Sequence, residues 1–234
     1  MGGIAIILLF CVSPQAFGQQ QVKLDANDPA AKNEDKRVLG VIPNYRTAET
    51  TKEYHPISAR YKLTIAAKDS FDYPLVGLGG AFAGLYQLAN SHPQFGQEEG
   101  GYFRRLATAY ADQAIGNMMT EGFLPALLKE DPRYFRMAEG TKKARAWYAV
   151  SRIVITKRDN GKRSFNFSEV LGNGISTTIG LSYYSDNRDV RDFTLNWGTA
   201  LATDAAAQVL KEFWPDIKHK WMGRKKNLPQ MELR

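Results

Sequence analysis

The sequence predicts an all-α protein, a single bundle of five or six helices with close Gly- and Ala-rich contacts, preceded by an extended N-terminal arm. Apolar residues recur at helical spacing in several segments. Hydrophobic residues make up 44% of the 234 residues and charged residues 24%, as in proteins with a globular core. The chain is expected to divide into a signal peptide (1–18), an extended or flexible arm (19–57), a helical bundle (58–222) and a basic tail (223–234).

The N-terminus resembles a signal peptide. An apolar run from Ile4 to Val12 is followed by small residues at Ala16 and Gly18, although no Lys or Arg precedes the run. The run is too short to span a bilayer as a helix, which requires about 20 residues. We therefore expect cleavage after Gly18 and a location in the periplasm or cell envelope.

Cysteine and histidine usage argues against a metal or thiol site. Cys11 is the single cysteine and lies in the expected signal peptide, where the bulky Phe10 before it disfavours lipidation. The mature chain would then contain no disulfide and no thiolate. His55, His92 and His219 are far apart and lack metal-ligand spacing. No metal and no other cofactor is expected.

The first two helices of the bundle have recognisable start signals. Ser58 is expected to cap the first helix and Asp72 the second. The second helix, Leu75 to Ala89, contains four glycines, of which Gly80 and Gly84 have the spacing that allows two helices to approach closely. This helix fits tight packing inside a soluble bundle or, alternatively, contact with a membrane.

The stretch from Tyr102 to Phe135 carries polar residues within an apolar pattern. Gln113, Asn117 and Glu121 are four residues apart and share one face of the expected helix, with Asp112 beside them. Such a row is typical of a hydrogen-bonded core that fixes helix register, or of a polar site between helices.

A compact group of charged residues follows this stretch. Groups of this kind are most often surface ion pairs that contribute little to stability. The members are Lys129, Glu130, Asp131, Arg133 and Arg136.

The region 147–167 is ambiguous between helix and hairpin. Residues 141–156 have a helical apolar face, but β-branched residues near their end also fit a strand, and Asn160-Gly161 is a hairpin signal. Asn166 and Glu169 have capping-box spacing, which favours a helix from Phe167 to Tyr184.

The C-terminal end is basic. The last long helix is expected from Asp189 to Phe213, with Pro215 as its breaker. The net charge is +7, and residues 211–234 contain seven basic and three acidic residues, a net charge of +4. A basic end interleaved with Trp favours an anionic membrane surface or cell-wall polymer as partner, and not nucleic acid. The candidate membrane- or anion-binding residues are Lys218, Lys220, Trp221, Arg224, Lys225 and Lys226.

Five segments together resemble a family of exported bacterial proteins of the acidobacterial type. They are KDSFDYP (68–74), DQAIGNMMTEG (112–122), EDPRYFR (130–136), FNFSEVLGN (165–173) and LKEFWPDIK (210–218). The resemblance covers nearly all of the mature chain. The family has no assigned activity, so the resemblance implies export and a shared helical domain, and it transfers no catalytic residue.

The function expected from the sequence is that of a non-enzymatic cell-envelope protein at a membrane surface or cell-wall polymer. The chain has no GxSxG, Walker A, HExxH or CxxC motif. The alternative is an enzyme that acts on a lipid or cell-wall substrate in a polar pocket between helices. Its catalytic candidates are Asp112, Asn117, Glu121, Asn173 and Asp204. The sequence leaves the oligomeric state open.

The export hypothesis predicts a mature chain that begins at Gln19. Mass spectrometry of the protein isolated from its native cell envelope should detect this N-terminus. An intact chain that still begins at Met1 in the envelope would contradict the expected location.

Overall fold

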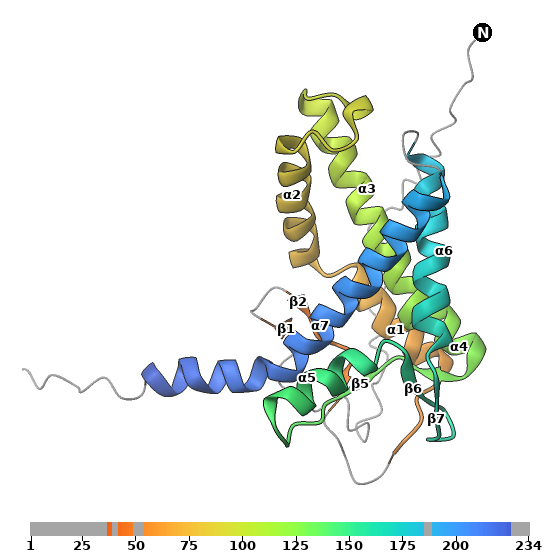
Figure 1. The fold of residues 1–234 in the computed structure, drawn as a ribbon, viewed down its shortest axis with the longest axis vertical. Coiled ribbons are helices and arrows are strands. Elements are labelled where there is room, and N and C mark those ends of the chain that lie inside the picture. The colour runs from red at the N-terminus through yellow and green to blue at the C-terminus, as the bar shows by residue number, and fades with distance from the viewer. Residues whose placement is uncertain (1–36, 39–41, 49–53, 185–188, 226–234) are drawn as a thin grey trace, which may run out of the picture. The chain divides into compact units, whose positions relative to one another are not determined.

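The computed structural model describes residues 37–38, 42–48, 54–184 and 189–225. Contacts divide the chain into residues 1–32 and 33–234, and every described residue belongs to the second unit. This unit is mostly helical, as the sequence predicts (Figure 1). It also contains three small sheets, which the all-α expectation does not include.

The helical elements are α1 (Ala59–Ser70), α2 (Tyr73–Leu88), the 3₁₀ turn η2 (Pro93–Phe95), α3 (Glu99–Asn117), the π-helix η3 (Met118–Phe123), α4 (Leu124–Leu128), α5 (Lys142–Ser151), α6 (Phe167–Tyr183) and α7 (Val190–Lys225). The strands are β1 (Arg37–Val38), β2 (Ile42–Pro43), β3 (Thr47–Ala48), β4 (Glu130–Asp131), β5 (Tyr134–Phe135), β6 (Ile155–Arg158) and β7 (Arg163–Phe165). Helix α2 packs on α3, α3 on α6, and α6 on α7, while α1 lies against η3. Figure 1 shows α2 and α3 as neighbouring, oppositely running helices.

Helix starts follow the capping residues in the sequence. Ser58 Oγ accepts a hydrogen bond from the Tyr61 N–H (3.2 Å), and Asn166 Oδ1 accepts one from the Glu169 N–H (3.1 Å). Asp72 occupies the N-cap of α2 but makes no side-chain capping bond. The predicted starts of α1 and α6 are therefore confirmed with their caps.

The ambiguous region 147–167 contains both structures in succession. Helix α5 ends at Ser151, and β6 and β7 then form an antiparallel hairpin before α6 begins at Phe167. Gly161 lies in the hairpin turn with φ +79°, which glycine adopts without strain. The β6–β7 hairpin is extended by β4, so a three-stranded sheet forms within a largely helical chain.

Helix α7 continues through Pro215, which was expected to end it. Proline lacks an N–H and its ring displaces the carbonyl four residues earlier, so it bends a helix without always ending it. Figure 1 shows α7 changing direction along its length. As a result, Gly223 to Lys225 belong to α7 and not to a separate tail, and residues 226–234 lie outside the described part.

The segment Asn44–Ala48 does not behave as part of a flexible arm. Asn44, Arg46, Thr47 and Ala48 are buried, and β3 pairs in parallel with β5. The backbone N–H of Tyr134 donates to the Arg46 carbonyl (2.8 Å). The expectation of an extended arm over 19–57 is therefore wrong for this segment, because the sheet pairing holds it inside the domain.

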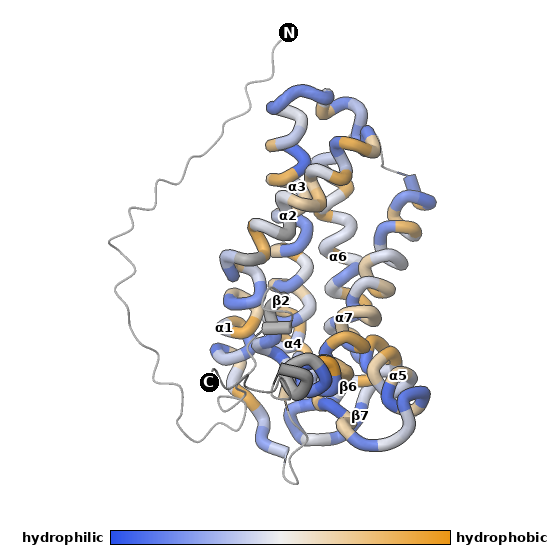
Figure 2. The backbone as a smooth tube through the Cα atoms, turned by 90° about the vertical axis from the view of Figure 1, so that its left-hand side faces the viewer, coloured by the Kyte–Doolittle hydropathy of each residue, from blue (hydrophilic) through white to orange (hydrophobic). Residues whose placement is uncertain are grey.

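The interior of the domain is largely polar. Among the described residues, few hydrophobic side chains are buried and four of them are alanines, whereas charged side chains such as Arg105, Glu130 and Glu212 are fully buried. Figure 2 shows hydrophobic residues recurring along the helices and a hydrophilic connection between α2 and α3. Buried charges are stable only when they are paired or hydrogen-bonded, so polar networks replace much of the usual apolar core.

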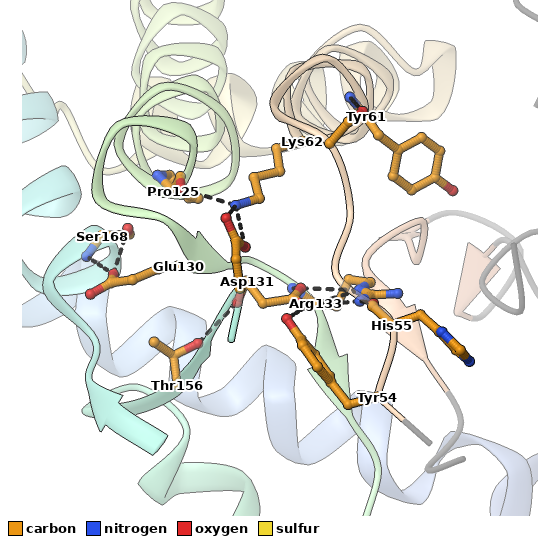
Figure 3. A network of polar contacts seen from close by, with 12 residues as sticks. Tyr54, His55, Tyr61, Lys62, Pro125, Glu130, Asp131, Arg133, Thr156 and Ser168 are labelled. Carbon is orange, nitrogen blue, oxygen red and sulfur yellow. Dashed lines mark hydrogen bonds and ion pairs between the residues drawn. The ribbon is translucent and has the colours of Figure 1, made fainter. Parts of the chain in front are cut away.

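One such network surrounds β4 (Figure 3). Asp131 accepts hydrogen bonds from Tyr54 Oη (2.8 Å) and from Arg133 Nη2 (2.7 Å), and Arg133 Nη2 donates to the His55 carbonyl (2.6 Å). Glu130 accepts two bonds from Ser168. The charged group around 129–136 was expected to form surface ion pairs. Instead, Glu130, Asp131, Arg133 and Arg136 are buried. The hydrogen bonds hold Tyr54, His55 and the start of α6 against β4.

Glycines permit close approach at specific points between helices. A Cβ on Gly172 would lie 2.8 Å from Thr120 Cγ2 and 3.2 Å from the Thr120 backbone, so α6 and η3 touch there. In α2, Gly80 faces Tyr102 of α3, whereas a Cβ on Gly84 would meet no atom within 4 Å. Close contact through glycine is thus shown at Gly80 and not at Gly84.

These contacts predict opposite effects for two Gly→Ala substitutions. Gly172→Ala should lower the free energy of unfolding by about 1–3 kcal/mol, since α6 must move away from η3. Gly77→Ala, at a helical position with no atom within 4 Å, should leave it unchanged or raise it by about 0.5–1 kcal/mol. Denaturant unfolding of both variants provides the measurement, and equal effects at the two positions would contradict the described α6–η3 contact.

Candidate functional site

The most unusual feature of the interior is a set of charged residues that we call the central cluster. It combines two basic and four acidic residues from five parts of the chain: Arg46 before β3, Asp69 on α1, Glu121 on η3, Glu169 on α6, and Asp204 and Lys211 on α7. All except Asp204 are buried, and Asp204 is half-buried. The cluster is therefore the point at which the N-terminal segment and four helices meet.

Arg46 connects two of the acidic helices. Its Nη1 lies 3.1 Å from Glu121 Oε1 and 3.7 Å from Glu169 Oε2. The hydrogen bond from the Tyr134 N–H to the Arg46 carbonyl fixes the backbone from which this side chain extends. Burial opposes ionisation of Arg46, but the surrounding carboxylates raise its pKa above the ordinary value and keep it charged.

Glu121 is placed by the π-helix. A π-turn inserts one extra residue into a helix and redirects side chains, and such turns are frequent at functional sites. Gly122 allows α1 to approach, because a Cβ there would lie 3.0 Å from Ala66 Cβ. Asp69, one turn further along α1, is thereby hydrogen-bonded to Glu121 through their side chains.

The carboxyl groups of the cluster form two pairs that require protons. Asp69 is hydrogen-bonded to Glu121, and Glu169 to Asp204. Two neighbouring carboxyl groups repel one another when both are ionised, so each pair favours the protonated form of one member.

Burial shifts the acid–base equilibria of these groups in the direction that the pairing requires. It raises the pKa of Glu169 to about 8, with a further contribution from Asp204 that opposes the lowering effect of Arg46. Burial and the neighbouring Glu121 raise the pKa of Asp69 well above its usual range. Burial also lowers the pKa of Lys211, whereas the nearby acidic residues favour its charged form and raise that pKa.

A small cavity adjoins the cluster. Its volume is about 30 Å³, and Thr120, Ser168, Glu169 and Gln208 are among the residues that line it. Glu169 Oε1 and Gln208 Oε1 are buried without a hydrogen-bond partner. A cavity of this size holds about one or two water molecules, and a water there could donate to both oxygens. In the part of the chain that the structure describes, no group of three or more His, Cys, Asp or Glu side chains is arranged to hold a metal ion.

Three of the five catalytic candidates from the sequence meet at the central cluster. Glu121 and Asp204 belong to it, and Asn173 Nδ2 donates to Asp204 Oδ2 (2.9 Å) and to the Glu169 carbonyl (3.0 Å). Asn117 does not join them; it is half-buried and its Oδ1 accepts a bond from Gln113 Nε2 (2.9 Å).

Asp112 lies in a separate polar contact. Its carboxylate accepts hydrogen bonds from Tyr183 Oη and from Tyr184 Oη (2.7 Å for Tyr184), and the Tyr184 ring stacks on His92 at 4.3 Å. The hydrogen bonds join α3 to the end of α6, and the stacked rings join the end of α6 to the loop after α2. Burial raises the pKa of Asp112, against the lowering effect of the two tyrosine hydroxyls.

The basic candidates near the C-terminus lie along α7. Lys218 is half-buried and Lys220 is exposed. Trp221, Arg224 and Lys225 are within the helix. Lys226 lies outside the described residues.

The sequence did not identify Arg46, Asp69, Glu169 and Lys211 as members of the site. Glu169 was assigned to a capping box, and its N–H is indeed capped by Asn166, but its carboxylate turns to Arg46 and Asp204. Asp69 and Lys211 stand within helical patterns where charges are normally solvated. The available signal was a single carboxylate in α1 and in α6, Asp69 and Glu169, which becomes informative only when the helices are known to converge.

Comparison with known proteins identifies no relative. No protein-family model, no curated protein and no solved structure matches the chain.

The raised pKa of Glu169 predicts that stability falls as pH rises. The unfolded chain releases this proton near pH 4.5, whereas the folded chain retains it to about pH 8, so folding is favoured less with each step between these values. The free energy of unfolding should decrease with a slope of up to about 1.4 kcal/mol per pH unit for this proton.

Substitution identifies the group responsible. Glu169→Gln, a neutral isostere of the protonated acid, should reduce the slope, whereas Glu99→Gln at an exposed position should preserve it. Denaturant unfolding from pH 5 to 8 measures both. A slope that is the same in the wild type and in Glu169→Gln would show that Glu169 is ionised when folded.

Proposed function

We propose that this protein is a non-enzymatic, exported cell-envelope protein that associates with a membrane surface through exposed apolar side chains of α2. The observation that carries the proposal is the distribution of polarity, with charged networks inside and large apolar side chains outside. In water, the opposite arrangement is favoured. In contact with acyl chains, polar groups are satisfied internally and apolar side chains face the lipid.

Helix α2 gives the clearest example of an apolar exterior. The chain contains no Asp, Glu, Lys or Arg from Tyr73 to Gln97. Six large apolar side chains of α2 are exposed, and Leu88 is 86% exposed. They are Tyr73, Val76, Phe82, Leu85, Tyr86 and Leu88.

The exposed positions of α2 are spread around more than half of the helix circumference, at about 100° per residue. The contact with α3 runs between these positions through small residues, where Gly79 faces Leu106 and Gly80 faces Tyr102. A single rigid partner covers one face of a helix, whereas a fluid apolar medium contacts every exposed direction. This geometry supports lipid as the partner of α2.

Other helices continue the apolar exterior. Phe167, Leu171 and Ile175, spaced four residues apart on α6, form an exposed stripe, and Val190 and Leu195 are exposed on α7. None of the described helices combines the length and the low polarity needed to cross a bilayer. The proposal is therefore association with one leaflet, to which the basic residues 218–226 would add attraction for anionic headgroups.

The alternative, an enzyme that acts on a lipid or cell-wall substrate, has less support. Its candidates Glu121, Asn173 and Asp204 do converge, but they hydrogen-bond to one another or pair with Arg46. The adjoining cavity of about 30 Å³ admits water and is too small for a lipid or a sugar.

The proposal predicts that the full mature chain binds neutral phosphatidylcholine vesicles. Phe82→Ser/Leu85→Ser on α2 should weaken binding at least about ten-fold, since each side chain loses its burial in lipid. The matched control is Phe123→Ser/Leu127→Ser, which removes the same two residue types from other exposed positions. Vesicle flotation over a range of lipid concentrations measures the partition.

Circular dichroism of each variant should remain mainly helical, which excludes unfolding as the cause of weaker binding. Absence of wild-type binding would overturn the proposal. Equal weakening by both double substitutions would overturn the assignment of α2 as the contact.

A further inference from the structure

The β6–β7 hairpin and the residues before it form a second basic region, distinct from the C-terminal end. Residues 152–163 contain five basic residues and one acidic residue. The antiparallel registers place Lys157 between Arg163 on β7 and Asp131 on β4. Like charges at directly opposite positions destabilise a strand pair unless an anion compensates them.

The acidic groups near the hairpin are already engaged. Asp159 accepts two bonds from Lys62 Nζ (2.6 and 2.8 Å), and Asp131 forms an ion pair with Arg133 (2.7 Å). Glu130 is buried and accepts from Ser168. Among the described residues, no carboxylate lies within ion-pair distance of the side chains of Arg152, Lys157 and Arg163.

Lys157 and Arg152 are half-buried cations whose neighbours in the structure are mainly aromatic rings and other cations. Lys157 Nζ lies 4.1 Å from the centre of the Phe135 ring, and Arg152 Cζ lies 4.5 Å from the centre of the Tyr148 ring. Burial lowers the pKa of Lys157, and the charges of Arg133, Arg163 and Arg152 lower it further, against the effect of Asp131. Burial also lowers the pKa of Arg152, with a contribution from Arg163. A bound anion would relieve this repulsion.

Apolar side chains lie on the same face of the hairpin as the cations. In a strand, residues two apart share a face, so Phe165 lies on the face of Arg163, opposite Ile155 and beside Lys157. Phe165 is 47% exposed and meets the Phe167 ring edge-to-face at 4.9 Å. Cations next to exposed aromatic groups suit the headgroup level of a bilayer.

We propose that Lys157, Arg163 and Arg152 bind the phosphate of anionic lipid headgroups while Phe165 enters the lipid interface. The inference rests on the proposed membrane association and names the headgroup that it selects. Nucleic acid also offers phosphates, but the exposed Phe165 and Phe167 provide apolar surface that a bilayer buries and a nucleic-acid backbone does not.

The experiment compares binding of the full mature chain to phosphatidylcholine vesicles with and without phosphatidylglycerol at low salt. The wild type should bind the anionic vesicles more tightly. Lys157→Gln/Arg163→Gln should weaken binding to the anionic vesicles about thirty-fold, and Arg163→Gln alone about five-fold, from the loss of two charges or one. Binding to neutral vesicles should change little in either variant.

The control variant Arg60→Gln/Arg104→Gln removes two exposed charges elsewhere and should retain the preference for anionic vesicles more closely than the hairpin variant. The double variant also removes the contact of Lys157 with the Phe135 ring, so its melting temperature can fall for that reason, whereas Arg163→Gln at an exposed position should leave the melting temperature unchanged. The exposed single variant Arg163→Gln provides the same comparison if the double variant does not fold.

The remaining outcomes are distinct. Neutral-vesicle binding with an unchanged phosphatidylglycerol preference in the hairpin variants would overturn this inference and leave the proposed function standing. Absence of binding to any vesicle would overturn both. Tighter binding to a duplex oligonucleotide than to anionic vesicles, or binding of glycerol phosphate without any vesicle preference, would also overturn the headgroup assignment.

Discussion

The neutralisation of buried carboxyl groups by Arg46 is the interaction on which the arrangement of the domain depends. Arg46 lies between Glu121 of η3 and Glu169 of α6, and no helix supplies it. A buried carboxylate that loses its partner destabilises a protein by several kcal/mol, so these helices require the N-terminal segment to be in place. The parallel pairing of β3 with β5 fixes that segment. A two-stranded sheet with two residues in each strand therefore supports a largely helical fold.

The same requirement explains why polar networks recur through the domain. Glu212 on α7 is fully buried and accepts hydrogen bonds from Tyr134 Oη (2.7 Å) and Arg145 Nε (2.8 Å). Arg105 on α3 is buried among the carbonyls of the loop that follows α2 and donates to Gly96 O at 2.7 Å. Each network joins segments that are distant in sequence, and each fixes a unique register because its hydrogen bonds are directional. An apolar core would tolerate more alternative packings.

The proposed membrane association would make the polar interior and the apolar exterior consistent with one another. Hydrogen bonds within the domain do not depend on burial of apolar surface, so α2 can expose Phe82 and Leu85 to lipid without loss of the fold. The basic hairpin offers a complementary contact, since Arg163 and Phe165 share one of its faces. Charge and apolar surface together would set both the depth and the lipid preference of the association.

The sequence by itself determined most of the helices, because the apolar spacing and the caps Ser58 and Asn166 are local signals. It also placed Glu121, Asn173 and Asp204 among the candidate polar residues, since carboxylates and amides are unusual in apolar stripes. Only the tertiary structure decided that Glu121 and Asp204 meet Arg46 and Lys211 while Asp112 stands apart. The physical reason is that buried charges are neutralised by partners distant in the chain, and spacing along one helix carries no information about which helix, or which two-residue strand, will supply them.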